Sequence, residues 1–345
     1  MDLLLGGFRL RLVSEHSKLR EHVASVMVPP CATKPHRPGA DWTVLMEMAE
    51  PPTPDEVEAV FSDRPVLAFP RSGPRLAVVD DGGGRLRVMV KYRPGLAACV
   101  MEVDAAGRTT RVILPAGDEV SVRCADWLVR VFFASRMLAS GWHMLHASAV
   151  AVNGSAVLFL AGQGGGKSTL AHRACAEIGA AFLADDLILI GPDQTVVGWP
   201  TRVALPAALV SGSGEGCPNR PRVILSPSQH RVLLNRERSS PVPLGAVVSI
   251  VPTAGSEPLL VEQLHCLRSV QSAALDIPAQ RLHTSDVLGL TGGPRPAGRN
   301  VPAAIDRVLL SGVPAASLRI GDLRTLHQAP VWDLLSDLLP LPKAS

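Results

Sequence analysis

A glycine-rich loop between an apolar run and a helix-like segment constrains this chain more than any other feature. The apolar run covers residues 156–160, the loop covers residues 161–168 (AGQGGGKS), and the helix-like segment covers residues 169–178. Strand, glycine loop and helix in this order are the pattern of a phosphate-binding P-loop. Glycines let backbone N–H groups converge on phosphate oxygens, and the helix N-terminus adds partial positive charge. The segment therefore predicts an α/β domain with a phosphate site.

The loop residues have distinct expected contacts. We expect the nucleotide phosphates to be held by Gly162, Gln163, Gly164, Gly165, Gly166, Lys167, Ser168 and Thr169. Lys167 would reach the β- and γ-phosphates, and the Ser168 hydroxyl would ligate Mg²⁺. The cofactors implied are ATP and Mg²⁺. The first position is Ala161, where the strict pattern has glycine, and the alternative interpretation is a glycine-rich turn before an ordinary helix.

The composition limits the classes of protein to which this chain can belong. With 345 residues, of which 47% are apolar, the chain can form two domains with substantial cores. A net charge of +3 with mixed signs argues against a nucleic-acid partner. We expect a cytoplasmic protein with no membrane partner, because the sequence has neither a long uncharged apolar run nor a secretory signal. The six cysteines include no Cys-x-x-Cys pair, so reduced packing residues are expected.

The first third of the chain has the pattern of a β-rich domain. Strands are expected over residues 8–13, 85–90, 98–103 and 109–114, the last two forming a hairpin. Residues 121–140 then carry apolar side chains at helical spacing, and Gly141 is a helix stop. We therefore expect two domains: a β-rich N-terminal domain of unknown role over residues 1–120, and an α/β domain over residues 121–345.

A hairpin is expected immediately before the glycine loop. Asn153-Gly154 stands between the apolar runs 145–152 and 156–160, which is a strong hairpin signal. The strand that enters the loop should therefore be the second arm of an antiparallel pair, although sheets around such loops are usually parallel. Further strands are expected over 180–184, 187–190, 245–251 and 315–320, helices over 259–275, 303–310 and 331–339, and a long, partly mobile loop region over 207–243.

Two adjacent carboxylates could supply the metal ligand and the base that a phosphate-binding loop alone lacks. Asp185 and Asp186 end a short strand soon after the loop, so at least one should point toward the phosphates. One could hold the metal while the other acts as a base, with Asp185 the first choice for the base. The alternative is that the pair caps the next turn. His146, one strand earlier, could reach the same pocket, although a lone histidine on an apolar strand is usually a core residue.

These pieces together resemble the kinase core of the HPr kinase/phosphorylase family. The resemblance covers residues 145–190 and rests on Leu145-His146-Ala147, Asn153-Gly154, Ala161 to Ser168, and Ala184-Asp185-Asp186. It implies a mixed sheet with flanking helices, preceded here by the β-rich domain. It also implies that Lys167, Asp185, Asp186 and His146 are catalytic, and that Ser168, Asp185 and Asp186 contact the metal. Weaker similarity continues through residues 243–247 and 318–322.

The chain departs from the family in several places. Gly162-Gln163 stands where the family's loop has an acidic-Ser pair. The Arg-Gly-Leu-Gly-like signature after the core is missing, and no HPr-docking C-terminal helix can be identified. The N-terminal part does not match the N-terminal domain of HPr kinases. HPr as substrate and phosphorylase activity are therefore not implied.

The expected activity is transfer of the ATP γ-phosphate to a hydroxyl, a Ser or Thr of a peptide or small protein. Tailoring of a natural-product peptide is one setting that the resemblance implies, and a homo-oligomer is another family trait. The alternatives are a kinase of a small molecule such as serine or a biosynthetic intermediate, and a non-catalytic, nucleotide-dependent regulatory module. The candidates for acceptor-side contacts, against the alternative of solvated loop residues, are Arg202, Arg220, Arg222, Arg231, Arg236 and Arg238.

Overall fold

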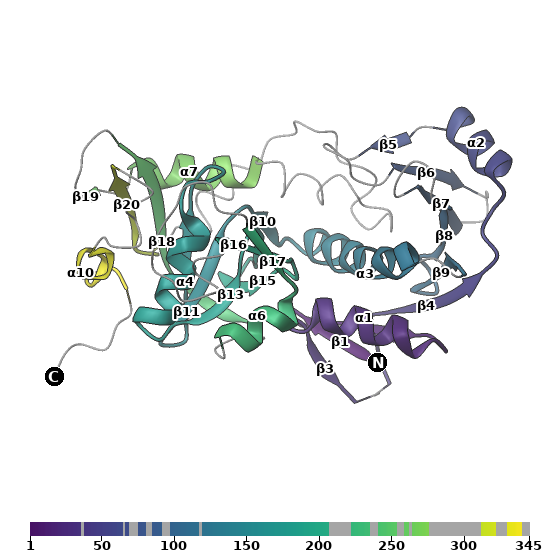
Figure 1. Ribbon diagram of the computed structural model, residues 1–345, viewed down its shortest axis with the longest axis horizontal. Coiled ribbons are helices and arrows are strands. Elements are labelled where there is room, and N and C mark those ends of the chain that lie inside the picture. Colours follow the sequence, from purple (N-terminus) through teal and green to yellow (C-terminus); the bar gives the residue numbers. More distant parts are fainter. Residues whose placement is uncertain are drawn as a thin grey trace. The chain divides into compact units, whose positions relative to one another are not determined.

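The computed structural model divides the chain into two compact units, each of which is a mixed α/β structure (Figure 1). The structure describes residues 1–35, 38–64, 66–68, 75–80, 85–91, 97–116, 119–206, 222–234, 241–253, 259–261, 264–275, 312–321 and 330–339. Among them, unit 1 comprises Met1–Met27 and Cys31–Ser140. Unit 2 comprises Val28–Pro30 and the described residues from Gly141 onward.

Unit 1 is built on a nine-stranded sheet in the order β3-β1-β2-β4-β9-β8-β7-β6-β5. The strands are β1 (Asp2–Leu5), β2 (Phe8–Val13), β3 (Ala32–Lys34), β4 (Trp42–Ala49), β5 (Val66–Ala68), β6 (Arg75–Asp80), β7 (Arg85–Lys91), β8 (Cys99–Asp104) and β9 (Thr109–Pro115). The β2–β4 and β4–β9 pairs are parallel and the other pairs are antiparallel. The predicted hairpin of β8 and β9 is confirmed, with Asp104 opposite Thr109.

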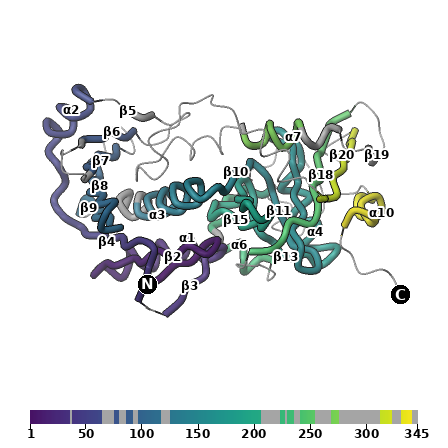
Figure 2. Tube along the Cα trace, turned by 180° about the vertical axis from the view of Figure 1, so that it is seen from behind, coloured from purple at the N-terminus to yellow at the C-terminus, as the bar shows by residue number. Residues whose placement is uncertain are grey.

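The helices described in unit 1 are α1 (Ser17–Met27), α2 (Pro54–Asp63) and α3 (Glu119–Ala139). Helix α3 packs against α1, β9 and β2 (Figure 2), and His22 Nε2 lies 3.1 Å from Asp126 Oδ1 across the two helices. The domain boundary expected between residues 120 and 121 falls within α3. By its contacts α3 groups with unit 1, and the boundary between the units follows Ser140.

Unit 2 contains a second nine-stranded sheet. Its strands are β10 (His143–Leu145), β11 (Ser148–Val152), β12 (Ser155–Leu160), β13 (Ala181–Ala184), β14 (Ile188–Ile190), β15 (Thr195–Gly198), β18 (Val242–Pro252), β19 (Leu259–Val261) and β20 (Ala315–Ile320). The order is β10-β14-β15-β18-β12-β11-β13, with β20 also pairing β18 and β19. The β12–β18 and β18–β20 pairs are parallel. A separate ribbon pairs β16 (Val203–Pro206) with β17 (Arg222–Leu225).

The hairpin before the glycine loop is confirmed. Strands β11 and β12 pair antiparallel, with Val152 opposite Ser155. Asn153 and Gly154 both have positive φ, 47° and 84°, as a type I′ turn requires. The expected strands over residues 180–184, 187–190, 245–251 and 315–320 are also present, as β13, β14, β18 and β20.

Helices cover both faces of the unit 2 sheet. The helices described there are α4 (Lys167–Glu177), α6 (Pro227–Leu234), α7 (Leu264–Leu275) and α10 (Val331–Leu335). Along β12, Val157 and Phe159 join the apolar cluster that includes α4 and α10 residues, while Leu158 and Leu160 join the cluster that includes α7 residues. The two-residue period of the strand thus divides one apolar run between two cores, and the glycine loop leaves the end of this strand.

Three expectations about unit 2 need correction. The loop region expected over residues 207–243 is wrong for residues 222–225, 227–234 and 242–243, which belong to β17, α6 and β18. The missed signal is a capping box: Ser226 N lies 2.9 Å from Gln229 Oε1, and Gln229 N lies 3.2 Å from Ser226 Oγ, with Pro227 in the first turn. The helix expected over 259–275 starts only at Leu264, because β19 precedes it.

The C-terminal helix is also shorter than expected, since α10 ends at Leu335. The helix expected over residues 303–310 lies outside the described residues. Cys31, Cys99 and Cys175 are buried, which confirms the packing role for these three. In the described part of the chain, no helix combines the length and apolar character needed to cross a membrane.

Candidate active site

The glycine loop between β12 and α4 is shaped by its glycines. Gly164 and Gly166 have positive φ, 76° and 91°, a conformation that L side chains disfavour. A Cβ on Gly165 would lie 2.6 Å from the Ala161 Cβ, whereas, chain neighbours aside, no atom of the described residues lies within 4 Å of a Cβ placed on Gly162 or Gly164. The loop is therefore closed on the Gly165 side and open beside Gly162 and Gly164, at the N-terminus of α4.

Lys167 holds a positive charge against this loop. It is the first residue of α4 and is only 7% exposed. Its Nζ donates hydrogen bonds to the carbonyl oxygens of Ala161, at 2.8 Å, and Gly162, at 3.1 Å. The ammonium group therefore lies across the start of the loop, within reach of any anion bound there.

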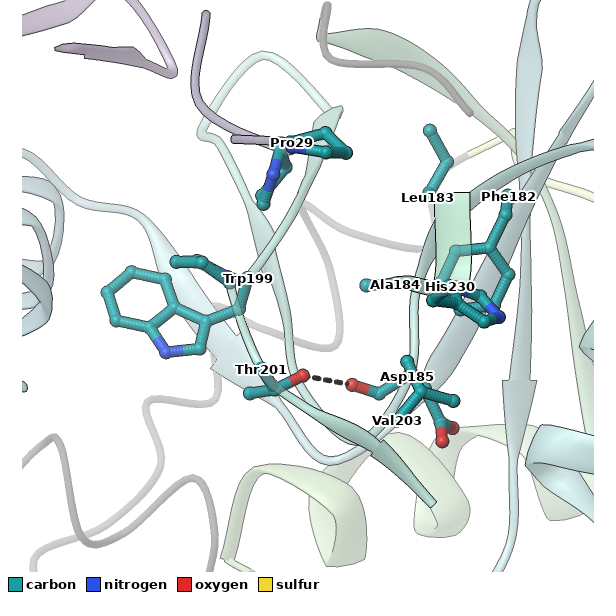
Figure 3. Close-up of a pocket in the computed structure, with 11 residues that line it drawn as sticks. Pro29, Phe182, Leu183, Ala184, Asp185, Trp199, Thr201, Val203 and His230 are labelled. Carbon is teal, nitrogen blue, oxygen red and sulfur yellow. Dashed lines mark hydrogen bonds between the residues drawn. The ribbon is translucent and has the colours of Figure 1, made fainter. Parts of the chain in front are cut away.

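Asp185 follows β13 and connects several elements. Its carboxylate Oδ1 accepts hydrogen bonds from Ser168 Oγ, at 2.8 Å, and from Ser148 Oγ, at 2.5 Å. Its main-chain oxygen accepts a hydrogen bond of 2.7 Å from the Thr201 hydroxyl (Figure 3). The residue is 6% exposed. The carboxylate is thus fixed between the first turn of α4 and the start of β11.

Asp186 lies in a different environment from its neighbour. Its backbone is left-handed, with φ of 73°, and its side chain is 49% exposed. Its Oδ1 lies 3.0 Å from Nε2 of the buried His146, whose backbone N donates to the Ala273 oxygen at 2.9 Å. The left-handed turn separates the two carboxylates. The Asp185 carboxylate is buried against two hydroxyls, whereas the half-exposed Asp186 carboxylate lies beside the buried imidazole of His146.

The structure brings most of the predicted site residues together. Ser168 contacts Asp185, His146 contacts Asp186, and the two aspartates are adjacent. Gly162, Gln163 and Gly164 are exposed, while Thr169 is partly buried in the first turn of α4. Two contacts of Asp185, from Ser148 and Thr201, were not predicted. Ser148 stands two residues after His146, a spacing that could have indicated a shared face; Thr201 carries no such signal.

A small, partly open pocket borders Asp185. Figure 3 shows Trp199 and Pro29 across it from Phe182 and His230. His230 Nε2 lies 3.1 Å from His172 Nε2, and the His230 ring lies edge-on to Phe182 with centroids 4.4 Å apart. Burial and the neighbouring His230 lower the pKa of His172 to about 3. These rings join α6 to α4 and β13.

The candidate arginines do not form a cluster that the structure describes. Arg202 and Arg231 are exposed, and Arg222 begins β17. Arg220, Arg236 and Arg238 lie outside the described residues. Among the residues that are described, no group of three or more His, Cys, Asp or Glu side chains is arranged to hold a metal ion. A magnesium ion here would rely on a hydroxyl, a carboxylate, phosphate oxygens and water.

No protein-family model and no curated protein matches the sequence. Among solved structures, the chain is similar to the Hpr(Ser) kinase/phosphatase from Coxiella burnetii, with 11% identity and a TM-score of 0.28. The match covers 56% of this chain and 94% of that chain. A likeness at this level carries no weight for function, which depends on the side chains described above.

Proposed function

We propose that unit 2 binds ATP with Mg²⁺ and transfers the γ-phosphate to a hydroxyl group. One observation carries this proposal: the adjacent aspartates after β13 contact the first-turn Ser168 of α4 on one side and His146 on the other. A hydroxyl, two adjacent carboxylates and an imidazole are thus linked by contacts that begin in the first turn of α4, directly after the glycine loop. Phosphoryl transfer needs a phosphate cradle, a metal-holding group and a proton acceptor.

The loop fits a nucleotide phosphate. The space beside Gly162 and Gly164 is open, α4 directs its N-terminus at the loop, and Lys167 already lies against two of the loop's carbonyl oxygens. Residues 162–169 would hold the phosphates through backbone N–H groups and the lysine. When bound, Mg²⁺ would neutralise charge that develops on the transferring phosphoryl group.

The two aspartates have different proposed roles. Asp185 already accepts two hydroxyl hydrogen bonds on one oxygen, so we assign it to holding Ser168 and the metal. Asp186 is half exposed and paired with His146, so we assign it to receiving the acceptor proton, with His146 orienting the carboxylate. This assignment reverses the first choice made from the sequence, because the burial and bonding of Asp185 leave it less accessible to an incoming hydroxyl.

The proposed acceptor is a Ser or Thr hydroxyl of a peptide or small protein. The test incubates the purified chain with Mg²⁺, radiolabelled ATP and a panel of peptides, small proteins and free serine, and follows label transfer. Transfer to free serine in preference to peptides would identify a small-molecule kinase instead. Nucleotide binding without transfer to any member of a broad panel would favour a regulatory module.

Variants test the residue assignments. Lys167→Ala should abolish transfer, whereas Lys18→Ala, a change at an exposed lysine of α1, should leave it unchanged. Asp186→Asn should bind ATP with affinity close to that of the unmodified chain and lose at least about a hundredfold in kcat, as expected for removal of a general base. Full transfer activity in Lys167→Ala would contradict the phosphate assignment, and full activity in Asp186→Asn would contradict the base.

A further inference from the structure

We infer that Ser148 is a positioning residue that fixes the Asp185 carboxylate against Ser168 for metal binding. The inference rests on the proposed function and adds a residue that neither the glycine loop nor the aspartate pair indicates. Ser148 is fully buried at the start of β11. Its Oγ lies 2.5 Å from Asp185 Oδ1, within the range of a strong hydrogen bond between a hydroxyl and a carboxylate.

Hydrogen-bond counting explains why Ser148 matters. A serine hydroxyl has a single hydrogen to donate, and both Ser148 and Ser168 direct theirs to the same oxygen, Oδ1 of Asp185. The lone pairs of Ser168 Oγ therefore stay available for a metal. Because Oδ1 receives both bonds, the orientation of the carboxylate is set from two elements, β11 and α4.

The two serines that hydrogen-bond to Asp185 lie in different parts of the fold. Ser168 belongs to the first turn after the glycine loop, the part of the chain that a phosphate would contact. Ser148 belongs to β11, which is hydrogen-bonded to β12 on one side and to β13, the strand that leads to Asp185, on the other. Ser148 therefore keeps the carboxylate in place when the Ser168 oxygen binds a metal ion.

The same sheet offers a matched control. Ser317 on β20 is also fully buried, and among the described residues its Oγ has no hydrogen-bond partner. Ser317→Ala therefore removes the same atom from the same kind of site without touching Asp185. An effect seen with Ser148→Ala and absent with Ser317→Ala cannot be attributed to loss of a buried hydroxyl alone.

The experiment measures Mn²⁺ binding to the full chain by electron paramagnetic resonance, with a non-hydrolysable ATP analogue present. Ser148→Ala should weaken Mn²⁺ binding by about tenfold or more, the usual effect of losing a hydrogen bond to a charged group. Binding of the analogue without metal should stay unchanged, and Ser148→Thr, which keeps the hydroxyl, should restore most of the affinity. In an Asp185→Asn background, Ser148→Ala should have little further effect, because it acts through Asp185.

Two results would overturn the inference while leaving the proposed function intact. One is an Mn²⁺ affinity in Ser148→Ala equal to that of the unmodified chain and of Ser317→Ala. The other is an equal loss with and without Asp185, since Ser148 would then act by another route. A lack of Mn²⁺–nucleotide binding by the unmodified chain would overturn the proposed function itself, and this inference with it.

Discussion

Acidification should destabilise unit 2 through the buried pair His172 and His230. The rings meet at Nε2, 3.1 Å apart, and burial together with His230 lowers the pKa of His172 to about 3, from an ordinary value of 6.5. The unfolded chain therefore binds a proton between these pH values that the folded chain does not bind. The folded pKa is the lower one, so the stabilisation is complete above pH 6.5 and is lost as the pH falls toward 3.

The expected loss in the free energy of unfolding follows from the pKa shift of His172. Each pH unit below the unfolded pKa removes about 1.4 kcal/mol from the free energy of unfolding. Between pH 7.5 and pH 5 the loss from this group is therefore about 2 kcal/mol, a large part of the stability of an ordinary domain. The chain carries many other ionisable groups, so only a difference between variants isolates the histidine.

The His172→Gln variant is the one to compare with the unmodified chain, because the glutamine amide can still hydrogen-bond to His230 but does not titrate near neutral pH. Urea unfolding at a series of pH values gives the free energies, and hydrogen exchange of α4 amides localises the change to unit 2. Over this range the unmodified chain should lose about 2 kcal/mol more than His172→Gln. His16→Gln, at an exposed histidine, is the control and should follow the unmodified chain. Equal pH dependence in the unmodified chain and His172→Gln would refute the reasoning.

Three other changes probe the glycine loop and the packing near it. Gly198→Ala should cost at least about 2 kcal/mol, because its Cβ would lie 2.0 Å from the main-chain oxygen of Leu183 in β13, so its Tm in thermal unfolding should fall. Gly162→Ala, whose Cβ would have no other described atom within 4 Å, should keep the Tm and lose ATP affinity. Trp332→Phe should raise hydrogen exchange in α10, because it removes the 2.5 Å hydrogen bond from the indole to Glu177 at the end of α4. An unchanged Tm in Gly198→Ala, or unchanged hydrogen exchange in Trp332→Phe, would contradict these expectations.

Local signals in the sequence were sufficient to predict some elements of secondary structure. The Asn153-Gly154 turn needs positive φ at both positions, which these two residues tolerate best, so the hairpin could be read from the dipeptide. The capping box at Ser226 and Gln229 was equally local and was missed among Gly and Pro residues. The β19 segment, only three residues long, shares its apolar composition with α7, and periodicity alone cannot separate a short apolar strand from a helix.

The contacts of Asp185 depend on strand register, which the sequence does not specify locally. Strands β11 and β13 pair with a register shift between Ala149 and Val150, and Ala149 lies opposite Ala184. That pairing places Ser148 beside Asp185, and a shift of one residue would present the other face of the strand. Thr201 reaches the Asp185 main chain from beyond β15, a contact between segments that only the tertiary fold brings together.

The left-handed backbone of Asp186 explains how consecutive carboxylates can serve different chemistry. In an extended strand, neighbouring side chains point to opposite faces, and Asp185 directs its own into the sheet against Ser148 and Ser168. The turn at Asp186 carries the next carboxylate to His146, which precedes β11 by two residues. One short segment, His146 to Ser148, therefore contacts both aspartates, so a displacement of β11 should disturb metal binding and proton transfer together. Independent responses of the two functions to a substitution at Ala147 would argue against this coupling.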